Sequence, residues 1–157
     1  TFKINHLGFS RYTGRFDKVE GTLDFNSAEP EKSKLDVTIF VNNIDTNNVK
    51  LEEELRVDKW FDVIKYPRAT FHATKIERTD ATNGKITGDF TLKGKTHTVT
   101  LNGTFIGTGV HMMTKKQVIG FSASGTIHRS DYDVSNFLPM LGDEVTLQIE
   151  TEFNQTK

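Results

Sequence analysis

An alternation of apolar and polar residues runs through most of this chain and limits its fold more than any other feature. In residues 34–41 apolar side chains stand at every second position, at Leu35, Val37, Ile39 and Val41. A repeat of two places successive side chains on opposite faces of a strand, so one face is buried and the other is solvated. The same pattern predicts strands over 86–92, 98–105, 121–127 and 144–153, and a weaker form of it over 2–9, 14–25 and 69–76.

The strands predict an all-β fold. Turn-forming residues separate them, including Pro30, Asn83-Gly84 and Gly94. Strands that recur at intervals of about 8–12 residues are typical of a sandwich or a barrel, and alternation alone does not distinguish the two. Within 14–25 the alternation changes phase after Phe16, which predicts a bulge at Asp17-Lys18.

One segment departs from the strand pattern. Residues 47–58 are predicted to form a short helix, because an Asn is available as N-cap and acidic residues occur early. Leu51 and Leu55 lie one helical turn apart, on one apolar face. Trp60 and Phe61 follow the helix and are interpreted as a hydrophobic plug.

Composition excludes several classes of protein. The 157 residues suit one domain spanning 1–157, with 20 Lys plus Arg against 21 Asp plus Glu. This near-neutral net charge of −1 argues against a nucleic-acid partner, which usually requires a basic face. The sequence contains no apolar run of about 18 residues, so no membrane span is expected. The absence of Cys excludes disulfides, thiolate catalysis and Cys-based metal sites.

The predicted inward faces mix large and very small residues. Phe71, Phe90, Phe105 and Phe121 share these faces with Ala69, Ala73, Gly88, Gly103, Ala123 and Gly125. Small residues can let large ones interdigitate in a filled core. Alternatively, an eight-stranded barrel with an unfilled interior holds a small ligand, which would here be apolar. Both interpretations fit the pattern.

The sequence contains no recognisable catalytic motif. G-x-S-x-G, the P-loop and G-x-G-x-x-G are missing, and the five His residues form neither H-x-H nor H-E-x-x-H spacing. We therefore expect no metal and no cofactor. An enzyme that uses His6 and Asp131 as acid and base is kept as an alternative, because both lie beside apolar residues that shift pKa values.

An ordered set of short segments resembles the YceI-like family. No single segment is specific, but together they span nearly the whole chain in the family's order. The matching segments are His6-Leu7-Gly8-Phe9-Ser10, Gly14-Arg15-Phe16, Gly21-Thr22-Leu23-Asp24-Phe25, Ile44-Asp45-Thr46, Leu55-Arg56, Trp60-Phe61-Asp62, Lys65-Tyr66-Pro67, Gly88-Asp89-Phe90-Thr91-Leu92-Lys93-Gly94, Phe121-Ser122-Ala123, Ile127-His128-Arg129-Ser130-Asp131-Tyr132 and Gly142-Asp143-Glu144-Val145.

The resemblance implies an eight-stranded antiparallel, lipocalin-like β-barrel with the short helix near its mouth. It also implies that a polyisoprenoid or an isoprenoid quinone binds in the lumen, and that no reaction is catalysed. Family members are bacterial and usually exported, so a periplasmic or secreted location is expected from the resemblance alone. Residue 1 already lies within the first matching strand.

The leading hypothesis is therefore a binder or carrier of a long isoprenoid lipid. The predicted lumen residues are Ile4, Leu35, Val37, Ile39, Phe71, Phe90, Leu101, Phe105, Phe121, Ala123, Val145 and Leu147. The residues predicted to meet a polar head group or to line the mouth are His6, Arg56, Trp60 and Arg129. The alternatives are a filled barrel that serves as a structural or interaction module, and the His6/Asp131 enzyme. A homodimer is compatible with the sequence, which contains no motif for one.

Overall fold

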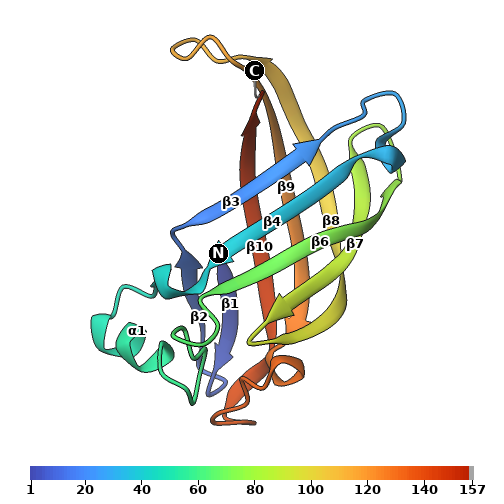
Figure 1. Ribbon diagram of the computed structural model, residues 1–157. Helices are drawn as coiled ribbons and strands as arrows, with labels where there is room; N and C mark the ends of the chain where they lie inside the picture. Colours follow the sequence, from blue (N-terminus) through green and yellow to red (C-terminus); the bar gives the residue numbers. More distant parts are fainter. Residues whose placement is uncertain (156–157) are drawn as a thin grey trace.

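The computed structural model describes residues 1–155 and forms one antiparallel sheet that curls strongly (Figure 1). The strands are β1 (Phe2–His6), β2 (Ser10–Phe16), β3 (Val19–Asp24), β4 (Lys34–Phe40), β5 (Ile44–Asp45), β6 (Arg68–Arg78), β7 (Asn83–Leu92), β8 (Lys95–Val110), β9 (Gln117–His128) and β10 (Leu141–Asn154). Their order in the sheet is β3-β4-β6-β7-β8-β9-β10-β1-β2-β5. The helix is α1 (Val49–Leu55), and three short 3-10 helices are η1 (Pro30–Lys32), η2 (Val41–Asn43) and η3 (Arg129–Tyr132).

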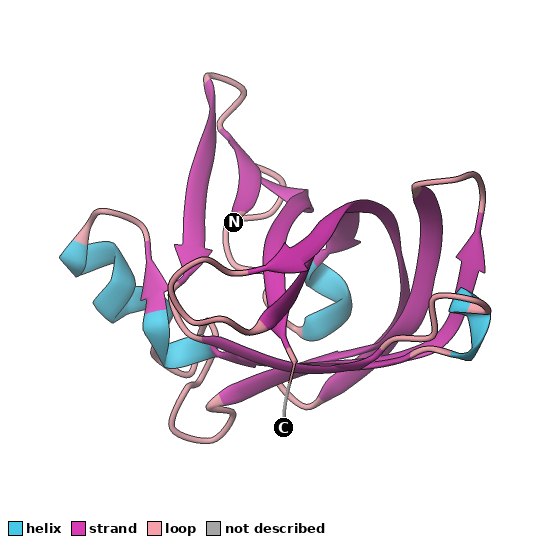
Figure 2. Cartoon of the chain, turned by 90° about the horizontal axis from the view of Figure 1, so that it is seen from above, coloured by secondary structure: helices cyan, strands magenta, loops and turns pink. Residues whose placement is uncertain are grey.

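The all-β prediction is confirmed, but the predicted number of eight strands is wrong because the sheet has ten. The predicted strand 14–25 is two strands, since β2 ends at Phe16 and β3 begins at Val19. The phase change therefore marks a break between strands rather than a bulge. The two-residue β5, which pairs with β2, also has too little alternation to be detected. Figure 2 shows that the sheet curves round on itself as a half-barrel.

A seam between β3 and β10 separates two parts of the curled sheet. Within residues 1–155 no strand pairing joins β3 to β10, although the two strands are neighbours. Side chains meet across the seam instead: a Cβ on Gly21 would lie 3.3 Å from Cε1 of Phe153. The ring centroids of Phe25 and Phe121 are 5.7 Å apart. Apolar contacts therefore bridge the seam at these two points in place of backbone hydrogen bonds.

Helix α1 is shorter than the predicted 47–58, but its signals are confirmed. Asn48 is the N-cap, and its Oδ1 accepts a hydrogen bond from the backbone N–H of Leu51 at 3.3 Å. After the helix, the N–H groups of Trp60 and Asp62 both bond to the carbonyl of Val57, which turns the chain away from the helix axis. No helix in residues 1–155 has the length and apolar character needed to cross a membrane.

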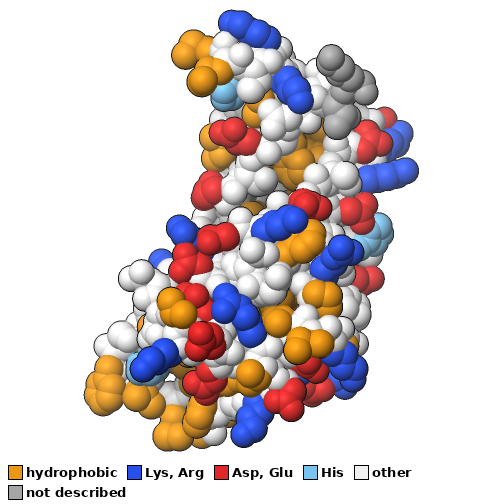
Figure 3. Space-filling view, turned by 60° about the vertical axis from the view of Figure 1, so that its left-hand side comes forward, with side chains coloured by type: hydrophobic (Ala, Val, Ile, Leu, Met, Phe, Trp, Pro, Cys, Tyr) orange, Lys and Arg blue, Asp and Glu red, His pale blue; other side chains and the backbone are white. Residues whose placement is uncertain are grey.

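The molecule has two distinct ends (Figure 1). The lower end holds α1, the β1–β2 turn and the loop 134–140, whereas the β8–β9 turn projects from the upper end. Apolar side chains gather at both ends of the face in Figure 3, and charged side chains of both signs are interspersed between them.

The close packing of β6 on β7 depends on Gly88. A Cβ at this position would lie 2.5 Å from the carbonyl oxygen of His72 and 2.6 Å from Cζ of Phe71. We expect Gly88→Ala to lower the free energy of unfolding by about 2–3 kcal/mol, because backbone and ring must both move. Urea denaturation checks this, with Gly107→Ala as the matched control. A Cβ at Gly107 meets nothing within 4 Å, so equal losses in both variants would contradict the packing argument.

Candidate functional site

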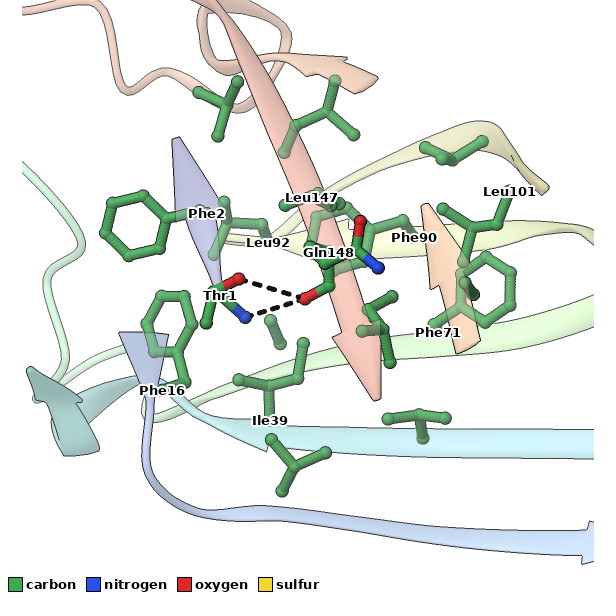
Figure 4. Close-up of a pocket in the computed structure, with 18 of the residues that line it drawn as sticks. Thr1, Phe2, Phe16, Ile39, Phe71, Phe90, Leu92, Leu101, Leu147 and Gln148 are labelled. Atoms are coloured by element: carbon green, nitrogen blue, oxygen red, sulfur yellow. Dashed lines mark hydrogen bonds between the residues drawn. The ribbon is translucent and has the colours of Figure 1, made fainter. Parts of the chain in front are cut away.

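A cavity of about 970 Å³ lies inside the curled sheet. All ten strands and α1 contribute to its wall, and most of the lining side chains are apolar. Figure 4 shows Phe71, Phe90 and Leu101 on one part of this wall, and Phe2, Phe16 and Leu147 on another. The apolar lining of the cavity follows from alternation, because each strand turns its apolar face inward.

Eleven of the twelve predicted lumen residues line this cavity. They are Ile4, Leu35, Val37, Ile39, Phe71, Phe90, Leu101, Phe121, Ala123, Val145 and Leu147. Phe105 is not among the lining residues. It pairs with Phe121 across β8 and β9, and the two ring centroids are 5.8 Å apart. The register between β8 and β9 shifts immediately after Phe105.

Sequence reasoning missed other lining residues that share the same signal. Val99 on β8, Ile127 on β9 and Ile149 on β10 belong to the alternating apolar sets and line the cavity. Phe2 and Phe16 line it as well, with ring centroids 5.7 Å apart across β1 and β2. Phe16 is out of phase with Val19 in the sequence, yet both residues line the cavity. This is possible because the chain breaks between β2 and β3, so the two residues belong to different strands.

Arg129 is a buried cation in the wall of the cavity. Arg129 is the first residue of η3 and is only 4% exposed. Nε donates to the carbonyl oxygen of Gly142 and Nη2 to that of Leu141, both at 2.8 Å, and Nη1 donates to the carbonyl oxygen of Val134. Burial lowers the pKa of Arg129 and the Asp143 carboxylate opposes this shift, but an arginine remains charged at neutral pH. The cavity therefore has a fixed positive charge at its lower end.

Asp143 steadies the segment that holds this arginine. Its two carboxylate oxygens accept hydrogen bonds from the backbone N–H and the hydroxyl of Ser130, at 2.8 Å and 2.7 Å. Partial burial raises the pKa of Asp143, but these hydrogen bonds and the charges of His128 and Arg129 outweigh that effect and leave the pKa below its usual range.

The other residues predicted for the head group are placed differently. Trp60 is buried, lines the cavity and lies with its ring centre 6.0 Å from the Arg129 guanidinium carbon. His6 lines the cavity from an exposed position. Arg56 does not line the cavity, because it donates to the carbonyls of Asn42 and Ile44 and so ties α1 to η2 and β5.

The structure does not bring His6 and Asp131 together in one site. Asp131 is exposed and is not among the residues that line the cavity. Among residues 1–155, no group of three or more His, Asp or Glu side chains is arranged to hold a metal ion.

The cavity is open at the lower end and along the seam. At the lower end, Leu7, Phe137 and Met140 line the cavity yet remain 46%, 58% and 58% exposed. Along the seam, Val19 and Phe25 also line the cavity and remain exposed. The predicted position of the mouth near the helix agrees with the first opening, because Leu51 and Leu55 of α1 line the cavity there.

Comparison with known proteins gives consistent results. A model of the YceI-like domain matches residues 1–153. Protein YceI of Escherichia coli O157:H7 is 37% identical over 156 residues, covering 99% of this chain and 81% of the relative. The crystal structure of the Campylobacter jejuni YceI protein superimposes with a TM-score of 0.87 at 36% identity, covering all of this chain and 92% of that one.

A more distant structure shares the fold alone. A polyisoprenoid-binding domain from Saccharophagus degradans, implicated in plant cell wall breakdown, aligns with a TM-score of 0.67 at 15% identity. The alignment covers 99% of this chain and 92% of that domain. The family match and the close relatives agree over nearly the whole length, and the chain belongs to the YceI-like domain family.

Proposed function

We propose that this protein binds a long isoprenoid lipid, either a polyisoprenoid or an isoprenoid quinone, inside the curled sheet. The observation that carries the proposal is the cavity of about 970 Å³, which is walled by apolar residues of every strand. This volume lies near the upper end of the 300–1,000 Å³ range that is typical of small-molecule sites. The polyisoprenoid-binding domain with the same fold supports this choice of ligand.

The wall is suited to a branched hydrocarbon chain. Transfer of apolar groups out of water yields about 0.8 kcal/mol per CH₂, so each five-carbon unit contributes about 4 kcal/mol before ordering costs. Phe71, Phe90 and Leu101 line the cavity and are already packed against their neighbours, so this part of the wall is ordered before a ligand enters. The binding energy in this proposal is therefore almost entirely hydrophobic.

The polar end of the ligand is proposed to lie at the lower end, near Arg129 and Trp60. The guanidinium is the one charged group among the buried residues in 1–155, and its positive charge, partly offset by the three carbonyls that it bonds, contributes a positive potential at this end of the cavity. Such a potential favours an electronegative group, such as a quinone carbonyl or a phosphate. The periplasmic or secreted location expected from the family belongs to the same proposal.

Binding without chemistry is the function that the geometry supports best. His6 and Asp131 do not form a pair, which disfavours the enzyme hypothesis. A cavity of this size disfavours the filled-core hypothesis, because a closely packed interior leaves few voids larger than a water molecule.

Native mass spectrometry of the purified protein tests the proposal. We expect an adduct that extracts into organic solvent as an isoprenoid or quinone, and we expect the delipidated protein to bind added geranylgeraniol. 1-Eicosanol, a straight-chain alcohol with the same number of carbons, serves as the control for chain branching. Protein that arrives free of lipid and takes up no geranylgeraniol would contradict the proposed function.

A further inference from the structure

We propose that the lower end of the molecule docks onto an anionic lipid bilayer through an apolar rim, an inference that rests on the isoprenoid-binding function proposed above. The rim consists of Leu7 and Phe9 in the β1–β2 turn and of Phe137 and Met140 in the loop 134–140. It would let the apolar ligand pass between the membrane and the cavity without crossing water.

The rim exposes large apolar side chains that the fold leaves uncovered. Phe9 is 89% exposed, Phe137 and Met140 are each 58% exposed, and Leu7 is 46% exposed. Figure 3 shows that apolar side chains gather at the lower end of the molecule. Clustered exposure of this kind marks interaction sites in soluble proteins, whereas single exposed apolar residues need no explanation.

Backbone hydrogen bonds hold the rim in its outward position. The N–H of Leu7 donates to the carbonyl of Met140 at 3.0 Å, which joins the two segments of the rim to each other. The N–H of Leu141 donates to the carbonyl of Phe137 at 2.8 Å. Leu7 and Phe137 adopt φ values of 56° and 62°, in the left-handed region that bulky residues rarely occupy. The fold thus maintains a strained arrangement that keeps these apolar side chains on the surface.

Continuity with the cavity argues for a membrane as the partner. Leu7, Phe137 and Met140 belong both to the exposed rim and to the cavity wall. An apolar chain that leaves the cavity here therefore emerges directly at the rim. A long isoprenoid partitions into a bilayer, so the surface that receives or supplies it is a lipid surface.

The charges on the two segments that form the rim favour an anionic bilayer, and acidic residues of this end, Glu52, Glu53 and Glu54, lie on α1 instead. Residues 1–16 contain Lys3, Arg11 and Arg15 but no Asp or Glu. Arg15 is paired with Asp17 and Asp45, whereas Lys3 and Arg11 take part in no ion pair within residues 1–155. The segment 134–142 contains no charged residue at all. Apolar side chains flanked by basic ones are typical of surfaces that lie in the interface of an anionic leaflet.

The β8–β9 turn provides an internal control for this inference. Met112 and Met113 are 84% and 87% exposed and are followed by Lys115 and Lys116, so the turn resembles the rim in composition. None of these residues lines the cavity, and the turn lies at the opposite end of the molecule (Figure 1). If membrane binding depends on the rim and not on the β8–β9 turn, the position of the rim at the mouth of the cavity is therefore what matters, rather than its composition.

Flotation with phosphatidylethanolamine/phosphatidylglycerol vesicles tests the proposal. We expect the natural protein to float with these vesicles and to bind pure phosphatidylcholine vesicles more weakly. Phe9→Ser should weaken binding at least about tenfold, because it removes the most exposed apolar group of the rim. Arg11→Gln should weaken it about fivefold, and added salt should reduce that difference. The control variant Met112→Ser/Met113→Ser should float like the natural protein.

Geranylgeraniol binding in vesicle-free solution separates this proposal from the proposed function. Phe9 does not line the cavity, so Phe9→Ser should keep its affinity for geranylgeraniol and its melting temperature. A natural protein that binds geranylgeraniol but not the vesicles would overturn the rim proposal and leave the function intact. Loss of flotation in the Met112/Met113 variant, or a dimer that Phe9→Ser dissociates in the absence of vesicle binding, would also overturn it.

Discussion

Replacing Ala123 with tryptophan should weaken isoprenoid binding by at least about a hundredfold while the protein remains folded. Ala123 lies on β9 and lines the cavity, and its partners across the two neighbouring strands are Gly103 and Ile149. A tryptophan here would extend into space that is already empty, so it need not displace packed neighbours. Exclusion of two five-carbon units alone would remove about 8 kcal/mol of gross hydrophobic transfer energy, which exceeds the effect predicted.

Titration of the delipidated protein with geranylgeraniol measures this effect, and thermal unfolding reports whether the sheet is intact. Thr126→Trp is the matched control, because Thr126 lies on the same strand but is exposed and does not line the cavity. The control should bind geranylgeraniol like the natural protein. If Ala123→Trp retains full affinity, the ligand does not occupy the cavity at this level.

Replacing Arg129 with methionine should lower the free energy of unfolding by about 3–5 kcal/mol. Methionine keeps much of the apolar stem but leaves the carbonyls of Val134, Leu141 and Gly142 without their donor. An unsatisfied buried acceptor costs about 1–3 kcal/mol, and local relaxation recovers part of the sum. In a chain of this length the loss corresponds to a melting temperature about 10 °C lower.

Arg129→Lys distinguishes the geometry of the guanidinium from its charge. Lysine keeps the positive charge but cannot direct three donors at three fixed carbonyls, so we expect a loss of about 2–3 kcal/mol. Urea denaturation of both variants, with the slope as a check on two-state behaviour, gives the two values. If Arg129→Lys is as stable as the natural protein, the positive charge alone stabilises this end of the molecule, and the three directed N–H donors of the guanidinium are not needed.

Much of the sequence-based prediction concerned which side of a strand faces inward, and there it performed well. Leu35, Val37 and Ile39 alternate without interruption, and all three line the cavity. The short helix was also predictable, because the Asn48 cap and the Leu51/Leu55 face are local features. Alternation of side chains and capping depend only on residues within one turn or one strand, and such information is fully present in a sequence.

The sequence was much less informative about pairing. Residues 14–25 read as one continuous strand, whereas β2 pairs with β1 and β5 while β3 pairs with β4. The two-residue β5 is defined by its partner alone. A period of two indicates the face of a strand but neither its neighbour nor its register, so the count of ten strands and the seam between β3 and β10 could not be predicted.

The all-β character of the chain, its apolar inward faces and its one capped helix are thus predictable from the amino-acid order, since they follow from local periodicity and capping. The tertiary structure decided the rest. Arg129 became a buried anchor because carbonyls 5 to 13 residues away converge on its guanidinium. Leu7 and Met140 became neighbours because β1 pairs with β10, although 133 positions separate them. Both features depend on long-range contacts between segments, whose energies no local pattern encodes.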